Sequence, residues 1–243
     1  MKVAVIGARG RMGRAVVDAI TASDGLRLGA AIDIDDSLGD VAGHEVAVIF
    51  TSPNAALDAI AACMDASVHC VVGTTGFDAE RLSDVERLSR EHPHLGILIA
   101  PNFAIGAVLM MEFARQAARL FSSIEIVEEH HPDKVDAPSG TAVRTAQIIA
   151  DARTGMPAMP DATSTALPGA RGASVSGVPI HSIRLRGVVA NQRVLLGNVG
   201  ETLTISHDST DRASFMPGVI LAVRGIAQRP GLHIGLETML DLG

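Results

Sequence analysis

The sequence contains no tryptophan, no tyrosine and only two cysteines, Cys63 and Cys70, which do not form a CxxC motif. With a net charge of −7 and no indole or phenol rings, it provides neither a basic surface nor a stacking platform for nucleic acid. Long apolar runs and internal repeats are also missing, and the first residues predict a strand and a helix rather than a signal peptide. We therefore expect a soluble cytoplasmic protein with two reduced, half-buried thiols and small-molecule partners, and neither a nucleic-acid nor a membrane partner.

The residues that are present favour a well-packed globular protein. Hydrophobic residues make up 47% of the 243 residues, enough for the cores of one large or two modest domains. In the first part of the chain, predicted strands alternate with predicted helices, with strands at residues 2–6, 28–32, 46–50, 69–72 and 96–100 and helices at 54–66 and 79–91. This alternation indicates an α/β fold, a Rossmann-type doubly wound parallel sheet that binds ligands at the carboxyl ends of its strands.

A glycine-rich turn follows the first predicted strand. Gly7, Gly10 and Gly13 have the spacing GxxGxxG, whereas the usual dinucleotide fingerprint is GxGxxG. Gly7 permits a tight turn, Gly10 lets a pyrophosphate approach the backbone, and Gly13 lets the next helix pack closely on the sheet. Asp33 ends the second apolar run, where an acidic side chain binds ribose hydroxyls. These residues predict a dinucleotide cofactor, and the alternative is an ordinary glycine turn beside a surface aspartate.

Loops rich in small and polar residues follow the next three predicted strands. They comprise Phe50 to Pro53, Gly73 to Phe77 and Ala100 to Phe103. Turn chemistry alone accounts for glycine, proline, serine and asparagine in any one loop. Because all three loops lie at the ligand-binding edge of the predicted sheet, we expect them to contact the cofactor.

Beyond residue 105 the alternation stops. A helix predicted at 105–120, a strand at 124–127 and a helix at 142–152 precede a passage rich in Pro, Gly, Ser and Thr at 155–177. Strands predicted at 180–189, 192–197 and 201–207 follow one another directly, and a last helix is predicted at 213–227. Strands in direct succession predict a second α+β domain with a mixed or antiparallel sheet.

The predicted domain boundaries follow from this change of pattern. Residues 1–104 and 213–243 would form the dinucleotide-binding domain, and residues 105–212 a domain for substrate binding and oligomerisation. The passage at 155–177 is too long for a simple connector, so it is either a mobile loop or an arm that contacts another subunit.

The segment HHPDKVDAPSGTA at 130–142 concentrates groups that bind anions and donate protons. Two adjacent histidines and Lys134 precede Ser139, the expected N-cap of the following helix. The backbone N–H groups of Gly140 and Thr141 at that helix start favour a bound carboxylate or phosphate. A solvated loop with an ordinary helix cap is the structural alternative.

Metal binding is the competing chemical interpretation of this segment. It would use His130 and His131 together with Asp133 and Asp136. Adjacent histidines on an extended backbone point in opposite directions and do not converge on one ion. We therefore expect no metal.

Four stretches occur in the order typical of one enzyme family. They are GARGRMG at 7–13, VGTTGF at 72–77, APNFAIG at 100–106 and EHHPDKVDAPSGTA at 129–142, and the stretches PGARG at 168–172 and GETLTISHDS at 200–209 also fit. On these residues the chain resembles, over essentially its whole length, the 4-hydroxy-tetrahydrodipicolinate reductase or dihydrodipicolinate reductase family. Asn191 departs from the family, which more often has histidine there, and this concerns a local strand contact rather than the chemistry.

The resemblance implies an NAD(P)H-dependent oxidoreductase that reduces 4-hydroxy-tetrahydrodipicolinate to tetrahydrodipicolinate, with loss of water, in the diaminopimelate pathway of lysine biosynthesis. It implies His130 as the general acid, and a small cyclic dicarboxylate bound by His131, Lys134, Ser139, Gly140 and Thr141, with Lys134 also in proton transfer. The implied cofactor-binding residues are Gly7, Ala8, Arg9, Gly10, Arg11, Met12, Gly13, Asp33, Phe50, Thr51, Gly73, Thr74, Thr75, Ala100, Pro101, Asn102 and Phe103. Members of the family are usually homotetramers with a hinge between domains, and they require no metal.

The choice between NADH and NADPH receives opposing signals. Asp33 favours the free 2′-hydroxyl of NADH and repels a 2′-phosphate. Arg9 and Arg11 on the glycine turn can offer planar guanidinium donors to the 2′-phosphate of NADPH, unless they are merely solvated loop charges. We expect the opposing charges to allow both cofactors.

Two other functions remain as hypotheses. A different nicotinamide enzyme on this scaffold would need a covalent cysteine or another base, and neither Cys63 nor Cys70 lies in the predicted ligand loops. A nucleotide-sensing protein without turnover is the second hypothesis, against which His130 and Lys134 argue. A turnover assay distinguishes these cases.

Overall fold

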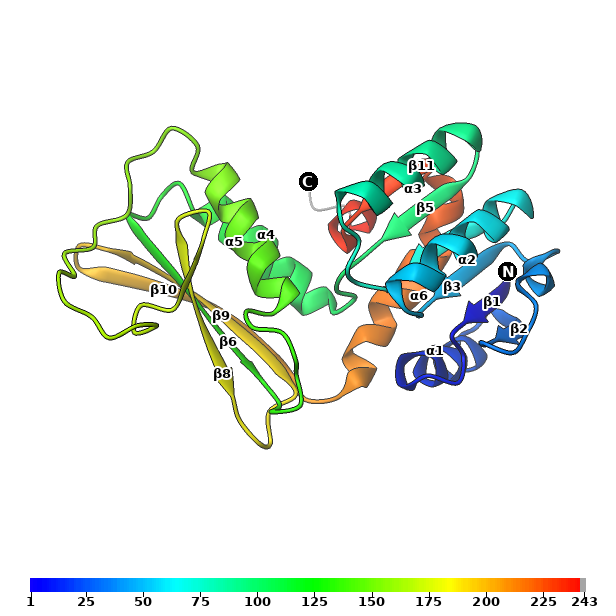
Figure 1. Cartoon of the computed structure of the whole chain (residues 1–243), viewed down its shortest axis with the longest axis horizontal. Helices are drawn as coiled ribbons and strands as arrows, with labels where there is room; N and C mark the ends of the chain where they lie inside the picture. The colour runs from blue at the N-terminus through cyan, green and yellow to red at the C-terminus, as the bar shows by residue number, and fades with distance from the viewer. Residues whose placement is uncertain (241–243) are drawn as a thin grey trace. The chain divides into compact units, whose positions relative to one another are not determined.

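The computed structural model describes residues 1–240 and divides into two compact units. Of the described residues, 1–105 and 212–240 form the first unit, and Gly106–Asp211 form the second. Each unit contains one β-sheet with helices packed on it (Figure 1). The chain therefore leaves the first unit once and returns to it after the second is complete.

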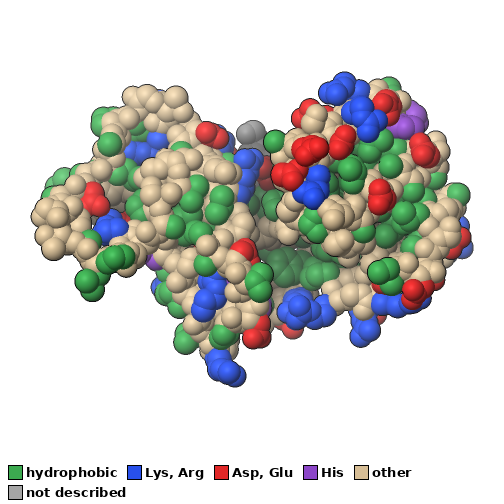
Figure 2. Space-filling model, viewed as in Figure 1, with side chains coloured by type: hydrophobic (Ala, Val, Ile, Leu, Met, Phe, Trp, Pro, Cys, Tyr) green, Lys and Arg blue, Asp and Glu red, His purple; other side chains and the backbone are tan. Residues whose placement is uncertain are grey.

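The surface carries charges of both signs. On the face that Figure 2 shows, acidic and basic side chains lie in small groups among uncharged side chains. Within residues 1–240, every helix is too short or too polar to span a bilayer.

A parallel sheet forms the centre of the first unit. In spatial order its strands are β11 (Gly231–Ile234), β5 (Gly96–Ile99), β4 (His69–Val72), β3 (Val46–Ile49), β1 (Lys2–Ile6) and β2 (Arg27–Ile32). One face packs against α1 (Arg11–Thr21) and α6 (Met216–Gly225), and the other against α2 (Pro53–Asp65) and α3 (Ala79–Glu91) (Figure 1). Short 3-10 helices occupy Leu38–Val41 and Leu236–Met239. The predicted doubly wound parallel sheet is confirmed.

The central strands are apolar throughout because helices cover both faces of the sheet. Every residue of β3 and β5 is buried, and so are Val3 to Ile6 in β1. The edge strand β11 is absent from the sequence-based prediction, since a four-residue segment that begins with Gly231 and is followed by Gly235 carries too short a pattern. Pairing with β5 in parallel register makes it a strand.

The two cysteines lie in this core. Cys63 in α2 and Cys70 in β4 are both free thiols and fully buried, so the prediction of half-buried thiols is wrong. Burial raises the pKa of the Cys70 thiol, and its contact with Cys63 raises it further. Two such thiols pack as small apolar side chains.

A mixed sheet forms the centre of the second unit, as predicted. Its strands lie in the order β10 (Glu201–Ser209), β9 (Ala190–Asn198), β6 (Ser123–His130), β8 (Val178–Arg184) and β7 (Ala173–Val175). β6 and β8 run parallel, while the other neighbours run antiparallel. The helix α5 (Gly140–Ala152) packs on β6 and β8, and α4 (Ile105–Ala117) places Gly106 against His207 of β10.

Alternation along these strands separates a buried face from an outward face. The buried face carries apolar side chains that include Ile124, Ile126, Val178, Ile180, Val194 and Leu196. The outward face carries half-buried or exposed side chains that include Glu125, Val127, Glu129, His181, Ile183, Arg193 and Leu195. Asn191 lies on the outward face, where its pairing with Glu129 and Asp208 keeps the strand ladder continuous.

Several element boundaries differ from the prediction. β6 extends to His130, so this residue ends a strand instead of lying on a loop, and β8 ends at Arg184. The helix predicted at 213–227 consists of a 3-10 turn at Arg212–Phe215, α6, and a second 3-10 turn at Ile226–Gln228. Pro217 at the first turn of α6 accounts for the first break, because proline is favoured where a helix begins.

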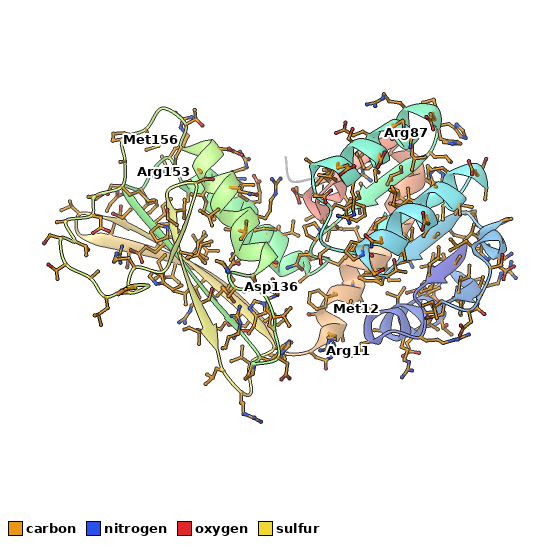
Figure 3. All side chains as sticks on the ribbon, in the orientation of Figure 1. Arg11, Met12, Arg87, Asp136, Arg153 and Met156 are labelled. Carbon is orange, nitrogen blue, oxygen red and sulfur yellow. The ribbon has the colours of Figure 1, made fainter. Side chains whose placement is uncertain are left out.

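The passage at 155–177 contains β7 and is fastened to the sheet. Arg171 donates to Glu125 of β6 at 2.5 Å and to Asp161 at 3.2 Å. Before this passage, Arg153 is the C-cap of α5 and donates to the carbonyls of Ala118 at 2.8 Å and Phe121 at 2.5 Å; Figure 3 labels this residue. The guanidinium of Arg153 thus satisfies backbone carbonyls at the end of α4.

Glu128 is the only carboxylate among residues 1–240 that is fully buried. Its oxygens accept Nη1 and Nη2 of Arg184, both at 3.0 Å, which joins β6 to β8. Burial alone would raise the pKa of Glu128, but hydrogen bonds from His130, Arg184 and Ser182 outweigh it and lower the pKa to about 2. The carboxylate is therefore ionised at neutral pH.

We predict that acid weakens the fold through this carboxylate. A group whose pKa is lowered by folding stabilises the protein above its unfolded pKa and loses that contribution as it protonates. The free energy of unfolding should therefore fall between pH 4.5, the ordinary pKa of the side chain, and about 2. The pKa difference corresponds to on the order of 3 kcal/mol. Urea unfolding at a series of pH values measures the free energy of unfolding. In Glu128→Gln this free energy should depend less on pH between 4.5 and about 2. An equal dependence on pH in both proteins would contradict the prediction.

Candidate active site

The glycine turn between β1 and α1 brings backbone into close contact with its neighbours. Gly7 has a φ of 83°, a conformation that favours glycine, and a Cβ there would lie 2.1 Å from the carbonyl oxygen of Phe50. A Cβ on Gly13 would lie 2.0 Å from the carbonyl oxygen of Gly7. Gly10 is the N-cap of α1 and has no side chain to bond the first N–H groups of the helix. Those groups point toward an anion that approaches the turn.

The remaining predicted residues of the turn differ in exposure. Ala8 is buried, Met12 is half-buried, and Arg11 is exposed at the start of α1 (Figure 3).

Asp33 follows β2 directly and is held by the turn. Its Oδ2 accepts the backbone N–H of Arg9 at 2.6 Å, and its Oδ1 accepts that of Ile34 at 2.9 Å. These two hydrogen bonds lower the pKa of Asp33, so it stands as a charged acceptor. The guanidinium of Arg9 pairs with Asp36 at 3.1 Å and with Asp35 at 3.4 Å. Arg9 is therefore held in an acidic cluster rather than standing as an unpaired loop cation.

A cavity of about 510 Å³ lies beside the turn. The predicted residues that line it are Gly7, Gly10, Asp33, Phe50 and Thr51. Ser52 of the predicted loop after β3 lines it too, and the lining residues absent from the prediction are Ile6, Ile34, Asp36, Leu38, Ala55 and Asp58. Apolar side chains, glycine backbone and a carboxylate together suit the base and ribose of a nucleotide.

The loops after β3, β4 and β5 form one contiguous edge. Thr74 Oγ1 accepts the N–H of Thr51 at 3.0 Å and donates to its carbonyl at 3.1 Å. The ring centroids of Phe50 and Phe103 lie 5.8 Å apart, and a Cβ on Gly73 would lie 2.1 Å from the Phe50 ring. The other predicted loop residues comprise buried Ala100, half-buried Asn102, and exposed Thr75 and Pro101. The structure thus brings together Phe50, Thr51, Gly73, Thr74 and Phe103, which were predicted on three separate loops.

In the second unit, β6 ends at His130, the first histidine of the pair. His130 lies on the same side of the strand as Glu128, and its Nδ1 is 2.5 Å from Glu128 Oε2. His131 begins the following loop, where its carbonyl accepts the N–H of Lys134 at 3.2 Å. Because consecutive residues of an extended backbone point to opposite sides, only His130 shares the side of Glu128.

The loop after β6 carries the ammonium of Lys134, four residues after His130 in the chain. Lys134 Nζ donates to Asp136 Oδ1 at 2.7 Å, on the loop where Figure 3 labels Asp136. Partial burial would raise the pKa of Asp136, but the hydrogen bond and charge of Lys134 lower it. Arg184 Nη2 donates to the Asp136 carbonyl at 2.7 Å and fixes this part of the loop.

The start of α5 is capped by a side chain and has open space beside its first turn. Ser139 is its N-cap, as predicted, and the hydroxyl accepts the N–H of Ala142 at 3.2 Å. A Cβ placed on Gly140 would meet nothing within 4 Å, so space is open beside the first turn. Behind the turn, Thr145 donates to the carbonyl of Thr141 at 2.7 Å. This constellation joins an imidazole, an ammonium and a helix N-terminus, which can donate a proton and bind a carboxylate.

Glu128 and Arg184 are absent from the sequence-based prediction, although they contact predicted site residues. Period-two alternation from Ile124 through Ile126 to Glu128 and His130 puts these four side chains on the buried face. That pattern is visible in the sequence and indicates Glu128. Nothing comparable indicates Arg184, because its contact depends on the register of β8 against β6.

Known proteins of one enzyme family are similar to this chain along its whole length. Residues 1–103 match the family described as dihydrodipicolinate reductase, N-terminus, and residues 106–240 match its C-terminus. The 4-hydroxy-tetrahydrodipicolinate reductase of Mycolicibacterium vanbaalenii is 56% identical over 244 residues, covering 100% of both chains. That of Mycolicibacterium smegmatis is 54% identical with the same coverage.

Solved structures agree with this similarity. A dipicolinate-bound dihydrodipicolinate reductase from Paenisporosarcina is 36% identical, with a TM-score of 0.86 and 99% of each chain covered. A scyllo-inositol dehydrogenase from Lactobacillus casei, at 12% identity, a TM-score of 0.63 and coverage of 98% of this chain and 92% of the other, shares the fold. The chain belongs to the dihydrodipicolinate reductase family, the nicotinamide-dependent reductases of the diaminopimelate route to lysine.

Proposed function

We propose that His130 is the general acid in the reaction of this family, the reduction of 4-hydroxy-tetrahydrodipicolinate to tetrahydrodipicolinate with loss of water. The observation that carries the proposal is that Glu128 contacts both His130 and the Ser139 N–H at the start of α5, while Arg184 links Glu128 to the carbonyl of Asp136, the partner of Lys134. The nicotinamide, when bound, supplies the hydride. Hydride addition leaves negative charge on the substrate, and an imidazolium neutralises it by giving up a proton.

The substrate would be a small cyclic dicarboxylate. The relative from Paenisporosarcina binds dipicolinate, which is such a compound. One carboxylate would accept the N–H groups at the first turn of α5, from Gly140 and Thr141, behind the Ser139 cap. His131 and Lys134 would bind from the adjoining loop, with Lys134 exchanging its contact with Asp136 for a substrate carboxylate. Lys134 would also assist proton transfer.

The cofactor would occupy the glycine turn and the edge formed by the loops after β3, β4 and β5. The fit rests on the close contacts at Gly7 and Gly13 and on the cavity beside Asp33. Residues 7–13 would bind the pyrophosphate and Asp33 the ribose diol. The nicotinamide and its ribose would contact the loops after β3, β4 and β5, through Phe50, Thr51, Gly73, Thr74, Thr75, Ala100, Pro101, Asn102 and Phe103.

Both cofactors would be used, with unequal parts for the two arginines. Arg11 is exposed and offers donors to a 2′-phosphate, whereas Arg9 is engaged by Asp35 and Asp36. Asp33 favours the 2′-hydroxyl of NADH. The 2′-phosphate of NADPH would therefore contact Arg11 directly, and it would contact Arg9 only if Arg9 gave up its ion pairs with Asp35 and Asp36.

We also propose a homotetramer that assembles through the outward face of the second unit's sheet. Ile183 and Leu195 expose apolar side chains on the same face as Val127, and adjoining exposed apolar side chains mark protein–protein contact sites. The ion pairs of Glu129 with Arg193 and of Glu125 with His181 lie on the same face and would fix the orientation of a second copy.

For the general acid, we predict that His130→Gln lowers kcat by at least ~100-fold, since general acid catalysis contributes about 10²–10⁴ in rate. Cofactor affinity should stay near normal, because the cofactor residues belong to the other unit. Stopped-flow or steady-state oxidation of NADH measures the rate, and His94→Gln, on an exposed loop, is the matched control. Near-normal turnover of His130→Gln would refute the assignment.

For the ammonium, Lys134→Ala should raise the substrate KM and lower kcat. A charge-assisted contact with a carboxylate is worth about 1.5–3 kcal/mol, which corresponds to roughly 10–100-fold in kcat/KM. Lys134→Arg keeps the positive charge and should retain more of the binding than of the rate. If the alanine variant kept both parameters, the proposed role of Lys134 would be wrong.

For cofactor choice, replacing both Arg9 and Arg11 by alanine should weaken NADPH binding by ~1 to 3 kcal/mol and leave NADH binding nearly unchanged. Asp36→Asn releases Arg9 from a competing charge and should tighten NADPH binding, whereas Asp18→Asn, an exposed carboxylate on α1, should not. Fluorescence titration with each cofactor measures these affinities. Equal losses for both cofactors would assign the arginines to the shared pyrophosphate instead.

A further inference from the structure

We propose that Glu128 is the positioning residue of this site, holding the proton donor and the carboxylate-binding turn in register with each other. The inference rests on the proposed roles of His130 and of the start of α5. Glu128 does not touch the reacting atoms in this proposal, because its side chain is fully buried. It acts through the groups that its two oxygens hold.

Each carboxylate oxygen of Glu128 holds a different part of the site. Oε2 lies 2.5 Å from His130 Nδ1 and accepts Arg184 Nη1 at 3.0 Å. Oε1 accepts the backbone N–H of Ser139 at 3.2 Å and Arg184 Nη2 at 3.0 Å. One side chain thus connects the end of β6, the N-cap of α5 and the end of β8.

The contact with His130 determines which ring nitrogen faces away from the core. An ionised carboxylate only accepts hydrogen bonds, so the proton stays on Nδ1, and Nδ1–H donates a hydrogen bond to Glu128. The other nitrogen, Nε2, is then the one that carries the transferable proton. When Nε2 gives up its proton and keeps the electron pair, the neutral imidazole that remains is the Nδ1–H tautomer, which Glu128 stabilises. The lowered pKa of Glu128, about 2, agrees with a carboxylate that stays ionised while His130 exchanges its proton.

The contact with Ser139 places the anion-binding turn. The Ser139 N–H is bonded to Glu128, and the Ser139 hydroxyl caps the Ala142 N–H, so both ends of this residue are fixed. The N–H of Gly140 follows directly and takes its position from Ser139. Arg184 extends the arrangement, because the same guanidinium that grips Glu128 also binds the carbonyl of Asp136, the partner of Lys134.

A purely structural role does not account for this set of contacts. An ion pair that only joined β6 to β8 would need Arg184 and Glu128, and an apolar pair of similar volume can replace such a buried pair. It would not need the His130 ring or the Ser139 amide on the same carboxylate. The other acidic residues of β6 do not share these partners, since Glu125 pairs with Arg171 and His181, and Glu129 with Arg193.

The first test observes the tautomer of His130 directly. In ¹⁵N NMR of the full-length protein at a pH where the ring is neutral, the proton should reside on Nδ1. The His130→Gln spectrum identifies the signal among the nine histidines. In Glu128→Ala the Nδ1–H preference should disappear. A wild-type ring protonated at Nε2, or an unchanged tautomer in Glu128→Ala, would overturn the proposal.

The second test is a double-mutant cycle in kcat. Glu128→Gln should lower kcat by between ~10-fold and ~10⁴-fold, the latter being the whole contribution of a general acid. In the His130→Gln background the same change should lower kcat by less than ~3-fold, because residues that act as a unit are not additive. Equal losses in both backgrounds would show that Glu128 acts independently of His130 and overturn the proposal.

Controls separate folding from positioning. Glu112 is another carboxylate that accepts hydrogen bonds from one arginine at both oxygens, from Arg115 Nη2 at 2.6 Å and Nε at 2.8 Å. Glu112→Gln removes this ion pair and should leave kcat unchanged. If Glu128→Gln alone does not fold, Glu128→Gln with Arg184→Met removes both charges and is used in the same cycle.

The outcomes also distinguish the two proposals. A slow His130→Gln beside a normal Glu128→Gln refutes the positioning role alone. A normal His130→Gln refutes the proposed general acid, while the NMR result still decides whether Glu128 orients the ring.

Discussion

A carboxylate with no access to water must find a partner for each of its oxygens, and in the second unit Glu128 meets this requirement with groups from three different segments. The alternation of β6 that buries Ile124 and Ile126 also buries Glu128, so the charge cannot turn to solvent without turning the strand. The position of α5, the end of β8 and the imidazole of His130 are therefore all constrained by one charge. The proposed proton donor, His130, and the start of α5 both contact this carboxylate directly.

The first unit depends on a different constraint, the absence of side chains at its turn. Gly7 and Gly13 each leave no room for a Cβ because backbone oxygens stand about 2 Å from where it would lie. This close packing brings Asp33, at the end of β2, to the N–H of Arg9. A single tight turn thus aligns the start of α1, where we propose that the pyrophosphate binds, with the Asp33 carboxylate, the proposed partner of the ribose. Charge organises the second unit, and close backbone packing organises the first.

The sequence predicts most of the fold because each long element carries its own periodicity. Strands such as β3 and β5 are buried on both faces and read as continuous apolar runs, and the glycine turn has a recognisable spacing. Short elements such as β11 escape prediction, since they become strands only through a neighbour from elsewhere in the chain. The candidate site follows the same rule. The segment from His130 to Thr141 is local and was predictable, whereas the pairing of Arg9 with Asp36 and of Glu128 with Arg184 depends on residues 27 and 56 positions away.

The path of the chain between the units has a consequence for the order of folding during synthesis. The second unit is inserted between β5 and the elements that complete the first sheet, so α6 and β11 emerge only after more than a hundred further residues have been made. Until then, β5 presents an unpaired edge and the sheet lacks one of its covering helices. Unpaired edges and uncovered apolar faces are where nascent chains aggregate. The strands and helices of the inserted unit are continuous in sequence. This unit can therefore complete its own core before α6 and β11 have been synthesised and added to the first unit.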